Sequence, residues 1–156
     1  MSETLQELFV KSLGKPVRLD NRVVFQLCRI PINHGMVTIS LLSPPNSDEG
    51  ICIKAPNGAI ELSDGTASET VYVWHEPNLP TRLSHHVNCP NGELLIWNIY
   101  RVHHPNGEVT VDFWTGNAGM TLLTDAPNRR RYACSDWRGS FDPPAIQFEV
   151  ELQDDT

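Results

Sequence analysis

Short runs of β-branched and aromatic residues, separated by proline and glycine, are the feature that most constrains the fold of this chain. Runs of this composition form strands, and the breakers between them form turns. All twelve prolines lie at or beside breaks or at the ends of runs, where the missing N–H does not interrupt a sheet. The sequence therefore predicts a mainly β protein, an antiparallel β-sandwich or a flattened β-barrel. The eight runs are residues 22–30, 36–42, 50–55, 70–75, 93–102, 108–114, 120–123 and 145–152.

Alternation within three of these runs indicates which strands are covered on one side and which on both. In run 145–152, apolar residues alternate strictly with Gln and Glu, which predicts an amphipathic strand. Run 93–102 is apolar on both faces and should be a central strand. In run 108–114, Val109, Val111 and Phe113 share one face, which predicts a half-buried strand.

The tripeptide Pro-Asn-Gly occurs at 56–58, 90–92 and 105–107. Proline suits the second position of a type I turn, and the glycine that follows suits a left-handed conformation at the fourth. The spacings share no period, so the tripeptide marks turns and not a repeat. The third copy predicts that residues 93–103 and 108–114 are antiparallel neighbours.

One helix and a single domain complete the expected architecture. Thr4 and Glu7 fit a capping box, and Gly14 follows as a stop, which predicts a short amphipathic N-terminal helix over about residues 4–13. The β-rich part is expected at 17–152, followed by a short acidic C-terminal tail. A chain of 156 residues suits one domain with one core.

The compartment is inferred from the cysteines and the N-terminus. The N-terminal residues lack the basic start and apolar stretch of a signal peptide, and no apolar run is long enough to span a bilayer. The four cysteines are widely spaced without a CxxC pair, which favours free thiols. We therefore expect a cytoplasmic protein that does not act on membranes.

The charge is acidic and uneven. The net charge is −7, with six basic and five acidic side chains in residues 1–60 and six basic and fourteen acidic in residues 61–156. This sign argues against nucleic acid as a partner and favours a basic protein, if charge selects a partner at all. The sequence leaves the oligomeric state open.

Histidine is the first candidate for chemistry. Five of the six histidines lie between residues 75 and 104. His75, Glu76, His85 and His103 could converge from adjacent strands on zinc, iron or copper. Solvated histidines near strand ends are the simpler interpretation, so no cofactor is expected and a transition metal is kept as the alternative.

The second candidate is segment 128–142, the only basic concentration in the acidic half. Arginine forks bind carboxylate or phosphate, and tryptophan offers a face for stacking. An exposed strand with paired arginines is the structural alternative. The residues nominated for ligand binding are Arg129, Arg131, Asp136, Trp137 and Arg138, together with Trp114.

The sequence carries no GxSxG, HExxH or GxGxxG motif, so the interpretation leans away from an enzyme without deciding the question. The leading hypothesis is a binding or interaction module for a protein partner or small ligand, for example an inhibitor or immunity-type protein. One alternative is a metal-assisted β-barrel enzyme that uses the histidines. Another is a binder of carbohydrate or another small molecule on a tryptophan platform.

Overall fold

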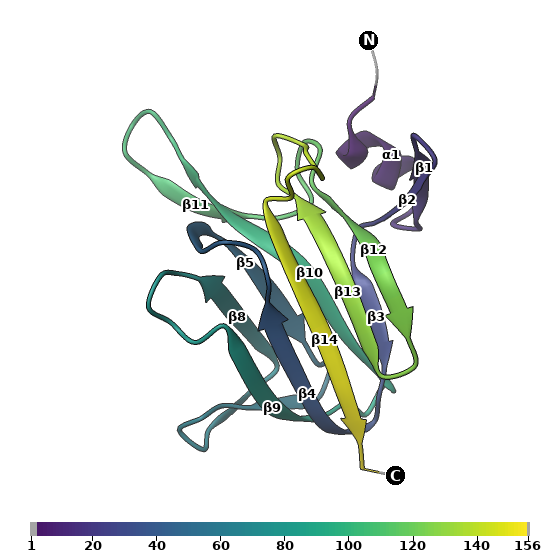
Figure 1. The fold of residues 1–156 in the computed structure, drawn as a ribbon, viewed down its shortest axis with the longest axis vertical. Helices are drawn as coiled ribbons and strands as arrows, with labels where there is room; N and C mark the ends of the chain where they lie inside the picture. Colours follow the sequence, from purple (N-terminus) through teal and green to yellow (C-terminus); the bar gives the residue numbers. More distant parts are fainter. Residues whose placement is uncertain (1–2, 156) are drawn as a thin grey trace.

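The computed structural model describes residues 3–155 and shows two antiparallel sheets packed face to face, with one short helix beside them (Figure 1). This confirms the predicted sandwich and the N-terminal helix. Neither sheet closes into a barrel.

The larger sheet has nine strands, and its centre is formed by segments from both ends of the chain. Strand β14 near the C-terminus lies between β13 and the early strand β4 (Figure 1). In spatial order the strands are β1 (Val17–Leu19), β2 (Arg22–Phe25), β12 (Gly119–Ala126), β13 (Arg129–Ser135), β14 (Ile146–Asp154), β4 (His34–Leu41), β9 (Arg82–Asn88), β6 (Ala59–Glu61) and β7 (Ala67–Ser68).

The smaller sheet has five strands around β10, which is the longest strand. Residues 94, 96 and 97–100 of β10 are buried, as predicted for a strand covered on both faces. The strands in order are β11 (Val109–Asp112), β10 (Glu93–His103), β5 (Asn46–Lys54) and β8 (Thr70–His75), with β3 (Cys28–Pro31) also paired to β10.

The main core lies between the two sheets. Ile39 and Phe148 of the larger sheet and Ile51, Ile53 and Ile96 of the smaller sheet are almost fully buried in one cluster. Each such side chain contributes roughly 1.5–3 kcal/mol by leaving water. All four cysteines are buried free thiols, as the sequence predicted.

Helix α1 (Leu5–Lys11) is held by the predicted capping box and is shorter than predicted at its C-terminal end. Glu7 N–H donates to the Thr4 hydroxyl at 3.2 Å. Leu5 and Phe9 pack on Val24 of β2 in a small second cluster. Leu13 adopts φ 57° and is exposed, so the chain leaves the helix before the last expected apolar position.

The Pro-Asn-Gly turns confirm the prediction in two of three copies. Gly92 and Gly107 have positive φ, and their N–H groups donate to the carbonyls of Cys89 and His104. At 56–58 it is Asn57 that has positive φ (58°), which is the geometry of a type II turn. The turn at 105–107 joins β10 to β11 as antiparallel neighbours, as expected.

The strand predictions differ from the structure in several places. Run 22–30 is divided into β2 and β3, and strands β1, β6, β7, β9 and β13 were not among the eight runs. Most of β9 lies at the surface, so it lacks the apolar alternation on which the prediction relied. In β11 the expected alternation is present, but Val109 and Val111 face solvent with exposures of 50% and 41%.

Candidate functional site

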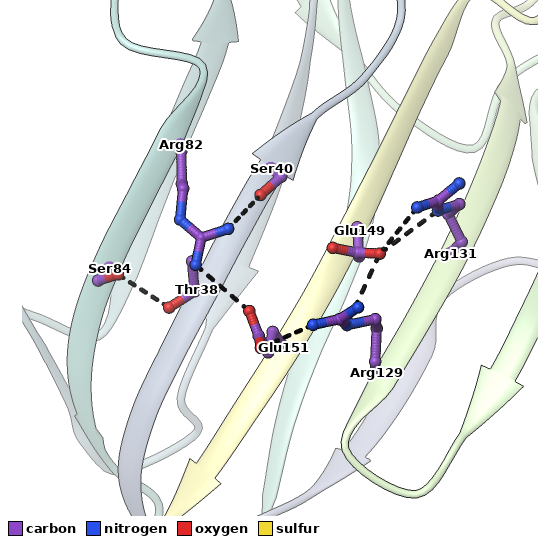
Figure 2. A network of polar contacts seen from close by, with 8 residues as sticks. All are labelled: Thr38, Ser40, Arg82, Ser84, Arg129, Arg131, Glu149 and Glu151. Atoms are coloured by element: carbon purple, nitrogen blue, oxygen red, sulfur yellow. Dashed lines mark hydrogen bonds and ion pairs between the residues drawn. The ribbon is translucent and has the colours of Figure 1, made fainter.

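The most organised polar surface is a row of alternating charges on the outer face of the nine-stranded sheet, which we call the charged ladder (Figure 2). It runs across strands β9, β14 and β13, past β4. The ladder consists of Arg82, Glu151, Arg129, Glu149 and Arg131.

Strand register explains why two of these arginines meet two glutamates. Arg129 is the cross-strand partner of Glu151, and Arg131 is the partner of Glu149. Cross-strand partners point to the same face, and residues two apart on a strand share that face. Tyr132, the residue after Arg131, packs in the core, so the ladder faces away from the core.

Each glutamate receives hydrogen bonds from guanidinium groups. Arg131 donates from Nε and Nη2 to Glu149 Oε1 at 3.4 and 3.2 Å. Arg129 Nη2 donates to Glu151 Oε1 at 3.0 Å, and Arg82 Nη2 donates to Glu151 Oε2 at 3.4 Å. The hydrogen bond from Arg129 lowers the pKa of Glu151, so this carboxylate stays ionised.

The two kinds of residue in the ladder differ in exposure. The side chain of Glu149 is only 10% exposed, whereas those of Arg131, Arg129 and Arg82 are 45%, 55% and 64% exposed. Glu149 therefore lies at the base, whereas Glu151 is 33% exposed, and both hold guanidinium groups that remain open to solvent. A guanidinium has five N–H donors, so each arginine keeps donors for a further acceptor.

A shallow polar pocket of about 390 Å³ lies at the β9 side of the ladder. Arg82, Arg129 and Glu151 line it together with Met36 and Thr38 of β4. Thr38 exchanges a 2.8 Å hydrogen bond with Ser84 across β4 and β9 (Figure 2). The pocket therefore has a fixed polar wall.

A second, mainly apolar pocket of about 610 Å³, which we call the apolar cleft, adjoins the other end of the ladder. Ala133 lies in its wall, two residues along β13 from Arg131 and on the same face. The Arg22–Asp142 ion pair, at 2.6 Å, lies at its rim. The other lining residues are Asn21, Val23, Phe25, Thr121, Leu122, Leu123 and Phe141.

The nominated segment 128–142 is thus divided between two places. Arg129 and Arg131 belong to the ladder, whereas Asp136, Trp137 and Arg138 lie in the loop after β13. Arg138 donates from Nη2 to Asp136 Oδ2 at 2.7 Å, and its guanidinium lies 4.7 Å from the centre of the Trp137 ring.

Both nominated tryptophans take part in packing within the chain. The ring of Trp137 lies 5.2 Å from that of Tyr100. The ring of Trp114 lies 5.3 Å from that of Trp97, and its indole N–H donates to the carbonyl of Gln26 at 3.0 Å. Each ring is therefore half-buried by packing within the chain.

Glu49 is a residue that sequence reasoning missed. It is completely buried, and neither carboxyl oxygen receives a hydrogen bond from a donor in residues 3–155. Burial first, and then the neighbouring carboxyl group of Asp136, raise the pKa of Glu49 to about 9. Glu49 lies at an irregularity in the pairing of β5 with β8. No pattern in the sequence predicts that irregularity.

The four nominated metal ligands do not form a metal site. His75 and His85 contact the backbone carbonyls of Ser43 and Glu61. Glu76 accepts from Arg101 at 3.0 Å, and His103 lies 2.9 Å from Asp48. Among the described residues, no group of three or more His, Cys, Asp or Glu side chains could hold a metal ion. Pairing in the β-sheets gives these side chains different partners.

Comparison with protein-family models, with curated proteins and with solved structures found no match. Within residues 3–155, no helix has the length and apolar character needed to cross a bilayer.

Proposed function

We propose that this protein is a binding module, and that the outer face of its nine-stranded sheet binds a protein partner. The charged ladder and the apolar cleft together form the binding surface. The observation that carries the proposal is the arrangement of exposed arginines on the buried Glu149 and the half-buried Glu151.

This arrangement prepares the arginines for binding. An arginine with no supporting contacts loses conformational entropy when it binds a partner. The free-energy cost is roughly 0.5–1.5 kcal/mol for each immobilised side chain. Arg129 and Arg131 are already oriented by Glu149 and Glu151, so most of that loss has been met on folding. Oriented arginines are also common among the residues that dominate protein interfaces.

The cleft supplies the apolar part of such an interface. Stable interfaces combine a buried apolar anchor with a polar rim. Ala133 in the cleft and Arg131 in the ladder are two residues apart on β13, which is roughly 7 Å at about 3.3 Å per residue. A partner strand or loop that presents an aromatic side chain and an acidic one at this spacing would engage both.

Local charge favours an acidic group on the partner. The ladder contains three arginines and two glutamates, so these five residues carry a net charge of +1 in a chain of net charge −7. The overall charge supports the other hypothesis, a basic partner. Charge substitutions within the ladder separate the two.

A cytoplasmic location belongs to the same proposal. The four buried free thiols suit a reducing compartment, because cysteines in oxidising compartments are commonly paired.

A second candidate function is binding of a small molecule in the apolar cleft. Its volume of about 610 Å³ falls within the range of about 300–1,000 Å³ typical of ligand pockets. The polar groups at its rim, Arg22 and Asp142, would orient such a ligand. This candidate needs the cleft and not the ladder.

Site-specific photo-crosslinking in cells that express the protein tests the leading proposal. A photoreactive residue replaces Ser84, which is exposed beside the ladder, or Tyr72, which is exposed on the other sheet. The proposal predicts a discrete crosslinked product from position 84, none from position 72, and loss of the product in Arg82→Gln/Arg129→Gln.

Two results would contradict it: equal products from both positions, or a product that survives the double substitution. Arg18→Gln is the matched control, because Arg18 is exposed and forms no ion pair within residues 3–155. If the cleft binds only small molecules, the photoreactive residue at position 84 gives no crosslink to a protein. In that case Leu123→Arg abolishes small-molecule binding, whereas Arg129→Gln does not.

A further inference from the structure

Glu49 and Asp136 form a pair of buried carboxyl groups that bridges the two sheets. Glu49 belongs to β5 of the five-stranded sheet, and Asp136 follows β13 of the nine-stranded sheet. Glu49 is completely buried and Asp136 is 3% exposed. Asp136 and Arg138 both lie close enough to Glu49 to affect its ionisation, so the pair lies beside the loop of residues 136–139.

The charges around this pair do not balance if both groups are ionised. Asp136 accepts hydrogen bonds from the Arg138 backbone N–H at 3.0 Å and from the Arg138 side chain at 2.7–3.3 Å. Glu49 accepts none from the described residues. Two buried carboxylates would then share one guanidinium, and like charges in a dry site strongly disfavour double ionisation.

The other charged or titratable groups that face the pair do not supply a second cation. Asp48 on β5 adds a negative charge, Cys134 on β13 is a buried thiol, and Tyr100 on β10 is the cross-strand partner of Glu49. No metal-binding group of three side chains occurs in the described residues. A proton is therefore the simplest way to satisfy both carboxyl groups.

We propose that Glu49 and Asp136 share one proton at neutral pH, which ties the two sheets together as a pH-sensitive latch. Protonated Glu49 donates an O–H hydrogen bond to the Asp136 carboxylate, and Arg138 neutralises the remaining negative charge. Loss of the proton turns the hydrogen bond into repulsion between two buried anions.

The loop of residues 136–139 contains Trp137, whose fluorescence should depend on whether the latch is closed. Asn117 N–H donates to the Trp137 carbonyl at 3.1 Å, and Gly116, with φ 53°, brings its backbone against Trp137. A Cβ at Gly116 would lie 2.6 Å from the Trp137 carbonyl oxygen. Opening of the latch should free Trp137 from Tyr100 and change its fluorescence.

The sign of the pH dependence follows from the direction of the shift. The pKa of Glu49 is raised from 4.5 to about 9, so between these values the folded state holds a proton that the unfolded state releases. The contribution of Glu49 to stability is full below about pH 4.5 and is lost progressively as pH rises to about 9. One linked proton changes the folding equilibrium constant about tenfold per pH unit.

Carbon-13 NMR of protein labelled at glutamate Cδ tests the proposal directly in the wild-type chain, which has ten glutamates. One resonance should remain at the protonated position at pH 7, titrate near pH 9, and be absent in Glu49→Gln. The change in tryptophan fluorescence should follow the same titration. Ten ionised glutamates at pH 7, with or without a bound cation, would overturn the proposal.

Two variants separate a shared proton from simple burial. Asp136→Asn should move the Glu49 titration towards its ordinary range; an unchanged midpoint would show that Glu49 holds its proton alone and would overturn the shared pair. Glu49→Gln keeps a donor to Asp136 but has no proton to lose. The ratio of its folding equilibrium constant to that of wild type should therefore rise about tenfold per pH unit between about pH 5 and 9. A constant ratio would count equally against the latch.

Discussion

Glu149 and Glu49 are both buried glutamates on strands of the sandwich, but the structure surrounds them in opposite ways. Glu149 lies under two exposed arginines on the outer face of β14. Glu49 lies at an end of the sandwich beside another carboxyl group and receives no hydrogen bond from a described donor. A buried carboxyl group must be neutralised either by a cation or by a proton, and this molecule shows both solutions.

The difference assigns the two residues to different tasks. A carboxylate neutralised by exposed guanidinium groups orients those groups for a partner and leaves them accessible. A carboxyl group that holds a proton presents nothing at the surface and instead ties two sheets together. The role of a buried carboxyl group can therefore be inferred only when it is known whether a cation or a proton neutralises it.

The largest expected effect comes from removing the one cation beside the latch. Arg138→Met leaves buried Asp136 without its guanidinium and should lower the free energy of unfolding by about 3 kcal/mol. Urea unfolding at pH 7 measures it, with Arg18→Met as the exposed control. A loss similar to that of the control would show that Arg138 does not support the pair.

An identical substitution at the two glutamates should give different results. Glu149→Gln removes the charge between Arg129 and Arg131 and should lower the free energy of unfolding by about 1 kcal/mol at pH 7. Glu49→Gln should instead raise the free energy of unfolding at this pH, because the amide is neutral without the proton that Glu49 must take up on folding. Equal losses in urea unfolding would remove the distinction between the two sites.

High salt should change the stability effect of Glu149→Gln but not that of Glu49→Gln, and this is the smallest of the expected effects. In about 1 M sodium chloride the Debye length is about 3 Å, so the exposed side of the ladder is screened. The stability difference between wild type and Glu149→Gln should shrink by about 0.3 kcal/mol, whereas that between wild type and Glu49→Gln should not change. A salt-sensitive Glu49 difference would indicate an ionised group.

Local patterns predicted most of the fold. Alternating and apolar runs predicted β10 and β14, and the capping box at Thr4 and Glu7 predicted α1. The eight runs omitted β9, because its surface position leaves its residues polar, and they also omitted β1, β6, β7 and β13. For β11 the same reasoning predicted one buried face without identifying it, since alternation reveals two faces but not which of them meets the core.

The site was predictable only in part. Arg129 and Arg131 were nominated from their concentration in the chain, and pairing with nearby acids was the stated alternative. Their partners depend on the register between β13 and β14, which adjacent residues in the sequence do not reveal. Glu49 was beyond prediction because Asp136 reaches it only through packing of the two sheets.

The central claim, that the charged ladder and the apolar cleft bind one partner, can be tested most directly with a defined peptide. An extended peptide with phenylalanine followed at alternate positions by two glutamates is titrated against protein labelled at arginine Nε and alanine methyl groups. The account predicts NMR shifts at Arg131, Arg129 and Ala133, none at Arg18, and loss of these shifts when glutamine replaces the glutamates. No shift at millimolar peptide, or equal shifts at Arg18, would contradict it.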